Sequence, residues 1–376
     1  MPVPPNPSDL NRLDQGVDPA ASPAPGREAL PPVADDGVPH RRRPRYQGKY
    51  PRRFEQKYKE HRPELYPETI GKVIASGKTP AGSHRPIMVD EVLQALVVRP
   101  GMAGVDCTLG WGGHAEAFLK YLSPGGRLIG LDADPLQLPR TVERLRAAGY
   151  EEEVFAAFRS NFAGLPSVLG KANLTSVDFV FADLGVSSMQ LDNPARGFSF
   201  KTDGPLDMRM NPGKPVTAAD LLRTQPAEVL AAVFRDNADE PHAATLAQGL
   251  AGREFPTTSK LAKAIDQLLG RTNAEEREAC KRRVFQALRI AVNQEFTALE
   301  TLLRALPLFL APGGRAAFLT FHSGEDRRVK QAFLAGSRAG IYSSIAPEVV
   351  RPSAAEVGAN PRAKPAKLRW AVRASA

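Results

Sequence analysis

Residues 104–115, Gly-Val-Asp-Cys-Thr-Leu-Gly-Trp-Gly-Gly-His-Ala, have the residue types of a nucleotide-binding turn. A short β-prone run carries Asp106 and leads into three glycines, and residues 115–122 then have helical character. Glycines between a strand and a helix let the backbone approach a ligand closely. The spacing Gly110-x-Gly112-x-x-Ala115 also fits a dinucleotide fingerprint. On its own, this spacing is therefore compatible with binding of NAD, FAD or S-adenosylmethionine. It is also compatible with a tight turn that binds no ligand.

Four strand-like runs alternate with helical stretches in the region that begins near residue 83. The runs occupy residues 105–108, 127–131, 153–158 and 176–182. Such alternation is typical of a mostly parallel sheet. Two further strands are expected at residues 316–321 and 367–373. The predicted fold class is α/β, with a Rossmann-like sheet.

Polar and aromatic residues that could bind a ligand stand at or just after the ends of these runs. They are Asp106, Asp132, Phe162 and Asp183. Asp132 lies 22 residues beyond Gly110, about the separation at which an acidic side chain meets a ribose hydroxyl. Ligands of parallel sheets bind beyond the carboxyl ends of the strands. We therefore expect these four residues to share one site.

An all-helical insertion is predicted within the sheet domain. Between residues 208 and 282 the helical stretches are 218–222, 227–234, 242–250 and 259–269, with no strand among them. Residues 284–303 then show the three-to-four spacing of one long helix packed on the sheet. The predicted domains are residues 1–80 (an N-terminal extension), 81–207 and 283–376 (the two parts of the sheet domain), and 208–282 (the insertion).

Composition limits the classes of protein. With 376 residues, 42% of them hydrophobic, the chain can build one elaborated domain or two. It has no apolar run near the roughly 18 residues of a membrane span, so no membrane partner is expected. Two cysteines, Cys107 and Cys280, cannot form a disulfide framework or a Cys-rich zinc site. We expect a cytoplasmic protein without a metal site.

The N-terminal extension changes character along its length. Residues 1–39 are rich in Pro and Ala, carry six acidic residues against two basic ones, and are predicted to be disordered. Residues 40–63 carry ten basic residues against two acidic ones, and four aromatic residues recur among them at every fourth position. Interleaved cations and aromatics suit phosphate contact and base stacking, and a solvated basic tail is the alternative.

Longer motifs resemble a known family, the bacterial 16S rRNA (cytosine-N4) methyltransferases. The resemblance runs from about residue 83 to the C-terminus. It is carried by His84-Arg-Pro86, Asp106-x-Thr108-x-Gly110-x-Gly112-Gly113-His114, Asp183-Leu-Gly-Val-Ser-Ser188, Gln190-Leu-Asp192, Arg196-Gly-Phe-Ser-Phe200, Asp203-Gly-Pro-Leu-Asp-Met-Arg-Met210, Phe285-Gln-Ala-Leu-Arg-Ile290, Phe321-His-Ser323 and Asn360-Pro-Arg362. The fold that this resemblance implies is a methyltransferase sheet with an inserted helical domain.

The resemblance implies a cofactor, a substrate and a set of site residues. The cofactor is S-adenosylmethionine, and its contacts fall on Gly112, Gly113, His114, Asp132, Phe162, Asp183 and Gln190. The substrate is a cytidine of 16S rRNA in the decoding-centre region of the small ribosomal subunit, methylated at its exocyclic N4. Asp183 is the expected catalytic residue, because an acceptor that bonds an N4 hydrogen makes the amino group a better nucleophile. The resemblance is compatible with a homodimer.

The chain departs from the family pattern in three places. Residues 1–80 precede the usual start, 279–282 replace a His-Pro-Ala segment, and 237–240 replace a Gly-Glu-Glu stretch. Elsewhere, His322 within a His-Ser-x-Glu-Asp run is expected to be structural or to orient RNA rather than to catalyse. Three arginines are equally suited to phosphates or to carboxylates, namely Arg196, Arg209 and Arg289.

Two other functions fit parts of the pattern. A nicotinamide-dependent dehydrogenase uses the same fold, but Asp106 before the glycines and Asp183-Leu-Gly after the fourth strand disfavour it. A non-catalytic RNA-binding assembly factor could keep the fold, but the intact glycine turn argues against it. The methyltransferase interpretation accounts for the most motifs.

Overall fold

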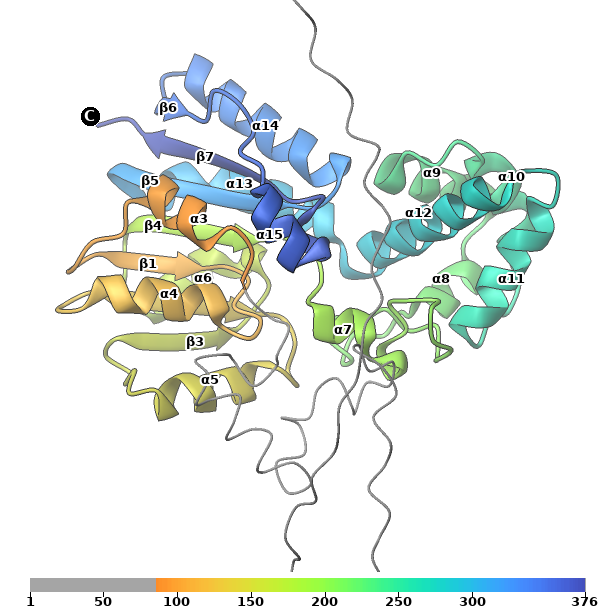
Figure 1. Cartoon of the computed structure of the whole chain (residues 1–376), viewed down its shortest axis with the longest axis horizontal. Coiled ribbons are helices and arrows are strands. Elements are labelled where there is room, and N and C mark those ends of the chain that lie inside the picture. The colour runs from red at the N-terminus through yellow and green to blue at the C-terminus, as the bar shows by residue number, and fades with distance from the viewer. Residues whose placement is uncertain (1–85, 376) are drawn as a thin grey trace, which may run out of the picture. The chain divides into compact units, whose positions relative to one another are not determined.

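The structure is a computed structural model that describes residues 86–375 (Figure 1). The predictions made for residues 1–80, disorder and a basic RNA-contacting run, lie outside the described residues. No helix in the described part of the chain has the length and apolar character needed to span a bilayer.

A seven-stranded sheet forms the centre of the domain, in the order β3-β2-β1-β4-β5-β7-β6. Its strands are β1 (Ala103–Asp106), β2 (Arg127–Asp132), β3 (Phe155–Arg159), β4 (Val177–Asp183), β5 (Leu310–Thr320), β6 (Tyr342–Ile345) and β7 (Lys367–Arg373). The first five run parallel, and β7 lies antiparallel between β5 and β6. This arrangement confirms the predicted α/β class and its mostly parallel sheet. The strand β6 was not predicted.

Helices cover both faces of the sheet, so both faces are buried. One apolar cluster includes side chains of α3 (Val89–Leu96), α4 (Gly113–Leu122) and α5 (Leu138–Ala147). The other includes α6 (Leu165–Lys171), α13 (Glu295–Phe309) and α14 (Ser323–Arg338). Along β4, Phe179 and Phe181 belong to the first cluster and Val180 to the second. Burial on two faces explains why these strands read as continuous apolar runs.

The helical insertion has an apolar core of its own. After the short α7 (Ser188–Asp192) come α8 (Ala218–Thr224), α9 (Ala227–Ala238), α10 (Ala243–Leu250), α11 (Thr258–Leu268) and α12 (Ala274–Asn293). A third apolar cluster joins buried side chains of these helices with Phe198, Leu206 and Met208. Figure 1 shows α8 to α12 gathered into one group, coloured green to cyan. The four predicted helical stretches of the insertion are all present.

One prediction about this region is wrong. The expected long helix over 284–303 is two helices, because Gln294 adopts a left-handed conformation with φ of 56° between α12 and α13. The apolar side chains of α12 pack into the insertion core, whereas those of α13 pack against the sheet. The predicted boundary at 282/283 therefore falls inside α12, and the chain returns to the sheet at Gln294.

Candidate active site

Three carboxylates meet at the carboxyl edge of the parallel strands. Asp106, Asp132 and Asp183 are the last residues of β1, β2 and β4, and β1 lies between the other two strands. In register, Asp106 stands opposite Gly130 of β2 and Phe181 of β4. The structure therefore brings three of the four residues predicted for one site to a single edge of the sheet. That they bind one ligand stays a prediction.

The glycine turn after β1 is packed against α5. Gly110 and Gly112 have φ of 51° and 77°, a region that L residues with side chains rarely occupy. A Cβ atom on Gly112 would lie 2.9 Å from the methyl group of Thr141. The hydroxyl of Thr141 donates to the carbonyl of Gly110 over 2.6 Å. Backbone freedom and close packing both require glycine here.

The carboxylate of Asp132 is held by two backbone amides. The N–H of Gly110 donates to Oδ2 and the N–H of Asp134 donates to Oδ1, each over 2.8 Å. Each oxygen keeps accepting capacity, so hydroxyl groups of a ligand can still bind. Burial raises the pKa of Asp132 to about 6. The position of Asp132 and the remaining accepting capacity of its oxygens fit the hydroxyl groups of a ribose.

Asp106 and Asp183 are linked through Thr108. Asp106 accepts a hydrogen bond from the N–H of Thr108 over 3.0 Å, and the hydroxyl oxygen of Thr108 accepts from the N–H of Asp183 over 2.6 Å. Burial, with the charge of Asp132 nearby, raises the pKa of Asp106 to about 7. Burial and the charges of Asp106 and Glu325 raise the pKa of Asp183 to about 8. The edge of the sheet is therefore a place where positive charge is favoured.

His114 lies beside Asp183 within the protein. Its Nε2 lies 2.9 Å from the carbonyl oxygen of Ile87, which can only accept, so Nε2 carries the proton. Burial lowers the pKa of His114 to about 4, so the ring is neutral at pH 7. The bare Nδ1 then lies 3.7 Å from Asp183 Oδ2. Asp183 itself keeps 29% of its side-chain surface and is reachable from outside.

The remaining expected cofactor residues occupy the same edge in different ways. Gly113 begins α4, and a Cβ there would lie 3.1 Å from Pro86. Phe162 follows β3 in a 3₁₀ turn and is partly buried against the core. The amide of Gln190 is used inside the protein, since its oxygen accepts from Ser187 N–H and its nitrogen donates to Asp134. The geometry of Gln190 favours a role in positioning Ser187 and Asp134 over direct contact with a ligand.

His322 caps a helix. It precedes α14, its Nδ1 accepts from the N–H of Glu325 over 3.4 Å, and its Nε2 lies 3.1 Å from Glu325 Oε1. The carboxylate of Glu325 also accepts from the N–H of Phe321. These contacts agree with the expected structural role of His322.

The three arginines left open by the sequence all hold carboxylates. Arg196 contacts Asp134 at 2.7 Å, Arg209 contacts Asp207 at 2.7 Å and Arg289 contacts Glu295 at 2.9 Å. Each is therefore a brace within the described part of the chain.

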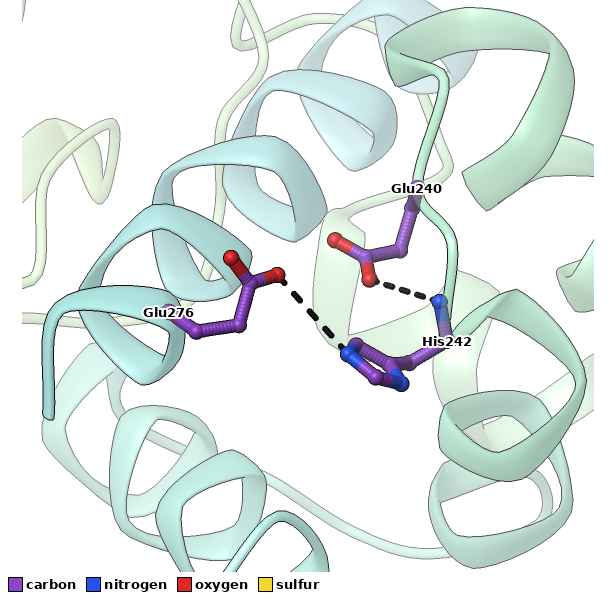
Figure 2. A group of neighbouring side chains, drawn as sticks. All are labelled: Glu240, His242 and Glu276. Atoms are coloured by element: carbon purple, nitrogen blue, oxygen red, sulfur yellow. Dashed lines mark hydrogen bonds and ion pairs between the residues drawn. The ribbon is translucent and has the colours of Figure 1, made fainter. Parts of the chain in front are cut away.

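A second polar cluster lies in the insertion. Figure 2 shows Glu240, His242 and Glu276 pointing toward one another, with potential ligand atoms within 4.8 Å. The guanidinium of Arg283 lies 2.7 Å from Glu240 and 2.5 Å from Glu276. A metal ion would have to displace that cation. We therefore assign the cluster to bracing α12 against the segment before α10.

Comparison with known proteins identifies the family. Residues 81–374 match the model of the MraW methylase family. The chain belongs to this family. Its cofactor is S-adenosylmethionine, which the glycine turn and the three carboxylates fit. Membership of a methylase family also removes the dehydrogenase interpretation.

Some relatives match more of the chain than the family model does. The "Ribosomal RNA small subunit methyltransferase H 1" of Lachnoclostridium phytofermentans is 47% identical over 352 residues, or 91% of this chain and 96% of its own. The protein of the same name from Agathobacter rectalis is 46% identical over 345 residues, or 89% of this chain and 98% of its own. A "Ribosomal RNA small subunit methyltransferase H" from Halorhodospira halophila is 40% identical and covers 80% of this chain and 98% of its own.

The shares of the chain that these relatives match show whether the N-terminal extension, residues 1–80, also occurs in other members of the family. A match to 91% of the chain is longer than the part that follows residue 80, so it includes some of the extension. The H. halophila match is about as long as the family model. The expectation that residues 1–80 are extra to the family is therefore wrong for some members.

Sequence reasoning missed three residues of the site. The sequence assigned no role to Thr108 or to Asp134, and it gave no link between Glu325 and Asp183. Asp134 is buried and accepts hydrogen bonds from Gln190 and Arg196, which lie 56 and 62 residues away in sequence. A second acidic residue two positions after Asp132 was the only signal in the sequence.

Proposed function

We propose that the protein methylates the exocyclic N4 of a cytidine in 16S rRNA, in the decoding-centre region of the small ribosomal subunit. The observation that carries this proposal is the position of Asp183. Its carboxyl group ends β4, stays partly exposed and stands beside the glycine turn. The names of the relatives support a substrate in small-subunit rRNA. A ribosomal substrate agrees with the expected cytoplasmic location.

The chemistry requires a better nucleophile and a proton acceptor. The N4 lone pair of cytosine is conjugated into the ring, so the amino group is a weak nucleophile. A carboxylate that accepts a hydrogen bond from N4 draws the lone pair out of conjugation and takes the proton as the new N–C bond forms. Bound S-adenosylmethionine supplies an electrophilic methyl group on a positively charged sulfur.

Asp183 must be ionised to act as this acceptor. Its pKa of about 8 applies to the protein without ligand. A positive charge within a few ångström favours the ionised form and lowers the pKa. Binding of the cofactor therefore favours the ionised form of Asp183, which is the form that accepts the proton. The glycine turn and Asp132 contribute to the rate by positioning the cofactor, because in-line transfer depends strongly on geometry.

The experiment is single-turnover transfer of labelled methyl groups to small subunits, followed by mapping of the modified nucleotide. Subunits from a strain without the gene are the substrate, and Asp183→Asn is the inactive comparison. Label at cytosine N4 supports the proposal. Tight binding without labelling would mean that the protein is an assembly factor, and label on another atom would overturn the assignment to N4.

A further inference from the structure

One loop touches both places where the chain passes between the sheet and the helical insertion. We call residues 207–210 the crossover loop. The outgoing passage includes Arg196, the last residue of a 3₁₀ turn (Pro194–Arg196). The returning passage is Asn293, the last residue of α12. Side chains from both passages hold this loop.

Arg196 binds the crossover loop through side chain and backbone. Its Nη2 donates to the carbonyl oxygens of Arg209 and Met210 over 3.0 and 2.8 Å. Its own carbonyl accepts from the N–H of Met208 over 3.0 Å. One residue therefore holds the loop twice, as a donor through its side chain and as an acceptor through its backbone.

Asn293 holds the loop from the opposite passage. Its Oδ1 accepts from the N–H of Met210, and its Nδ2 donates to the carbonyl oxygen of Met208, each over 2.8 Å. Met208 is buried and has φ of 64°. A non-glycine residue in this conformation costs free energy and persists only where the surroundings enforce it.

Asp134 connects the loop to the cofactor edge. Nη1 of Arg196 donates to Asp134 Oδ2 over 2.7 Å, and Asp134 keeps only 1% of its surface. The backbone N–H of Asp134 in turn donates to Asp132. A continuous series of hydrogen bonds thus runs from the ribose-binding carboxylate to the crossover loop.

We propose that Asp134 and Arg196 are positioning residues that couple cofactor binding at Asp132 to the orientation of the helical insertion. This inference rests on the proposed function, because the ligand bound by the oriented insertion is the RNA. A ligand that fixes Asp132 restricts the backbone of Asp134, and the buried ion pair passes this restriction to the loop. Cofactor and RNA then bind cooperatively, each raising the affinity of the other by the same factor.

The first test measures that factor. The Kd of S-adenosylhomocysteine is measured by calorimetry with and without saturating small ribosomal subunits, for the wild type, Arg196→Gln and Asp134→Asn. We expect the subunits to strengthen binding about 5-fold or more in the wild type, and the ratio to fall near 1 in both variants. Arg328→Gln is the matched control, because Arg328 holds Glu300 at 2.8 Å between α14 and α13 without spanning the passage. Variants that keep the wild-type ratio would overturn the coupling.

The second test does not involve RNA. Hydrogen exchange of the amides of residues 207–211 is followed on addition of S-adenosylhomocysteine alone. We expect slower exchange in the wild type and no change in Asp134→Asn, which retains an acceptor for Gln190. If the exchange rates of these amides in the wild type do not change on addition of the ligand, the coupling is overturned. A responsive loop in a protein that neither binds nor methylates subunits would refute the proposed function and leave the coupling intact. If Arg196→Gln fails to fold, Asp134→Asn decides both tests.

Discussion

The side chain of Thr108, just beyond β1, accepts a 2.6 Å hydrogen bond from the backbone N–H of Asp183 at the end of β4. Two neighbouring strands are thus joined at the point where the candidate catalytic carboxylate begins. The hydroxyl group sets where Asp183 can lie.

Replacing this hydroxyl tests its role. Thr108→Val keeps the shape of the side chain but leaves the N–H of Asp183 without an acceptor, which should cost about 1–3 kcal/mol of unfolding free energy. The single-turnover methylation rate should fall as well, because Asp183 loses its position. Denaturant unfolding and rapid-quench labelling measure the two effects. Thr108→Ser keeps the hydroxyl and should behave like the wild type; a defect as large as that of the valine variant would contradict this explanation.

Removal of the Asp132 carboxylate, the proposed acceptor for the ribose hydroxyls, should weaken cofactor binding. Asp132→Ala is expected to cost roughly 1.5–3 kcal/mol of S-adenosylmethionine binding, because a charged acceptor makes the hydrogen bonds. Isothermal calorimetry gives the value, and Asp132→Asn should lose less because it keeps one acceptor oxygen. Unchanged affinity in the alanine variant would rule out the ribose role.

Asp183→Asn should separate catalysis from binding. An amide cannot take the N4 proton, so the single-turnover rate should fall by about 10²-fold or more. The affinity for the cofactor should fall much less, since the amide keeps an acceptor oxygen. Rates from labelling and affinities from calorimetry are compared for one preparation. Equal losses in both would make Asp183 only a binding residue.

Cofactor binding should depend on pH. Burial, together with neighbouring carboxylates, raises the pKa of Asp106 to about 7 and of Asp183 to about 8 in the ligand-free protein. A cationic sulfonium prefers their ionised forms, so affinity for S-adenosylmethionine should rise between pH 6 and 8.5, with release of protons. S-adenosylhomocysteine lacks the sulfonium charge and should show a weaker rise. Calorimetry in buffers of different ionisation enthalpy counts the protons, and equal profiles for both ligands would exclude this linkage.

The same pKa shifts determine how stability depends on pH without ligand. A carboxyl group whose pKa is raised on folding binds more protons when folded, so its contribution to stability is present at low pH and is lost as pH rises through the folded value. The melting temperature of the ligand-free protein should therefore fall between pH 6 and 9. In Asp183→Asn the melting temperature should fall less over this pH range. A profile identical to that of the wild type would mean that the pKa of Asp183 is not raised on folding.

Deleting residues 1–80 tests the basic extension. The family model begins at residue 81, so the fold, cofactor affinity and methylated nucleotide should persist. Binding to small subunits should weaken, and log affinity against log salt should have a shallower slope, because fewer counterions are released. Deletion of residues 1–39 alone keeps the ten basic residues of 40–63 and is the matched control. Equal affinity and slope in both truncations would make the basic run a solvated tail, and unfolding would move the domain boundary.

The sheet and its polar edge were predictable for a physical reason. Strands buried on two faces form continuous apolar runs, and the residue ending each run must lie at the same edge. The strand β6 was missed because it is a four-residue edge strand with exposed Ser343 and Ser344. The break at Gln294 was missed because α12 and α13 are both amphipathic, so the apolar spacing continues through it. Partners such as Asp134 and Arg196 meet only in the folded chain.

The position of β7 between β5 and β6 has a consequence during protein synthesis. Among the strands of residues 86–375, β6 pairs with β7 alone, yet residues 367–373 are made after residues 342–345. A nascent chain in which β6 has already left the ribosome must hold this strand unpaired until β7 follows. The parallel core from β3 to β5 can form earlier, and the last two strands are then added in the reverse of their order of translation.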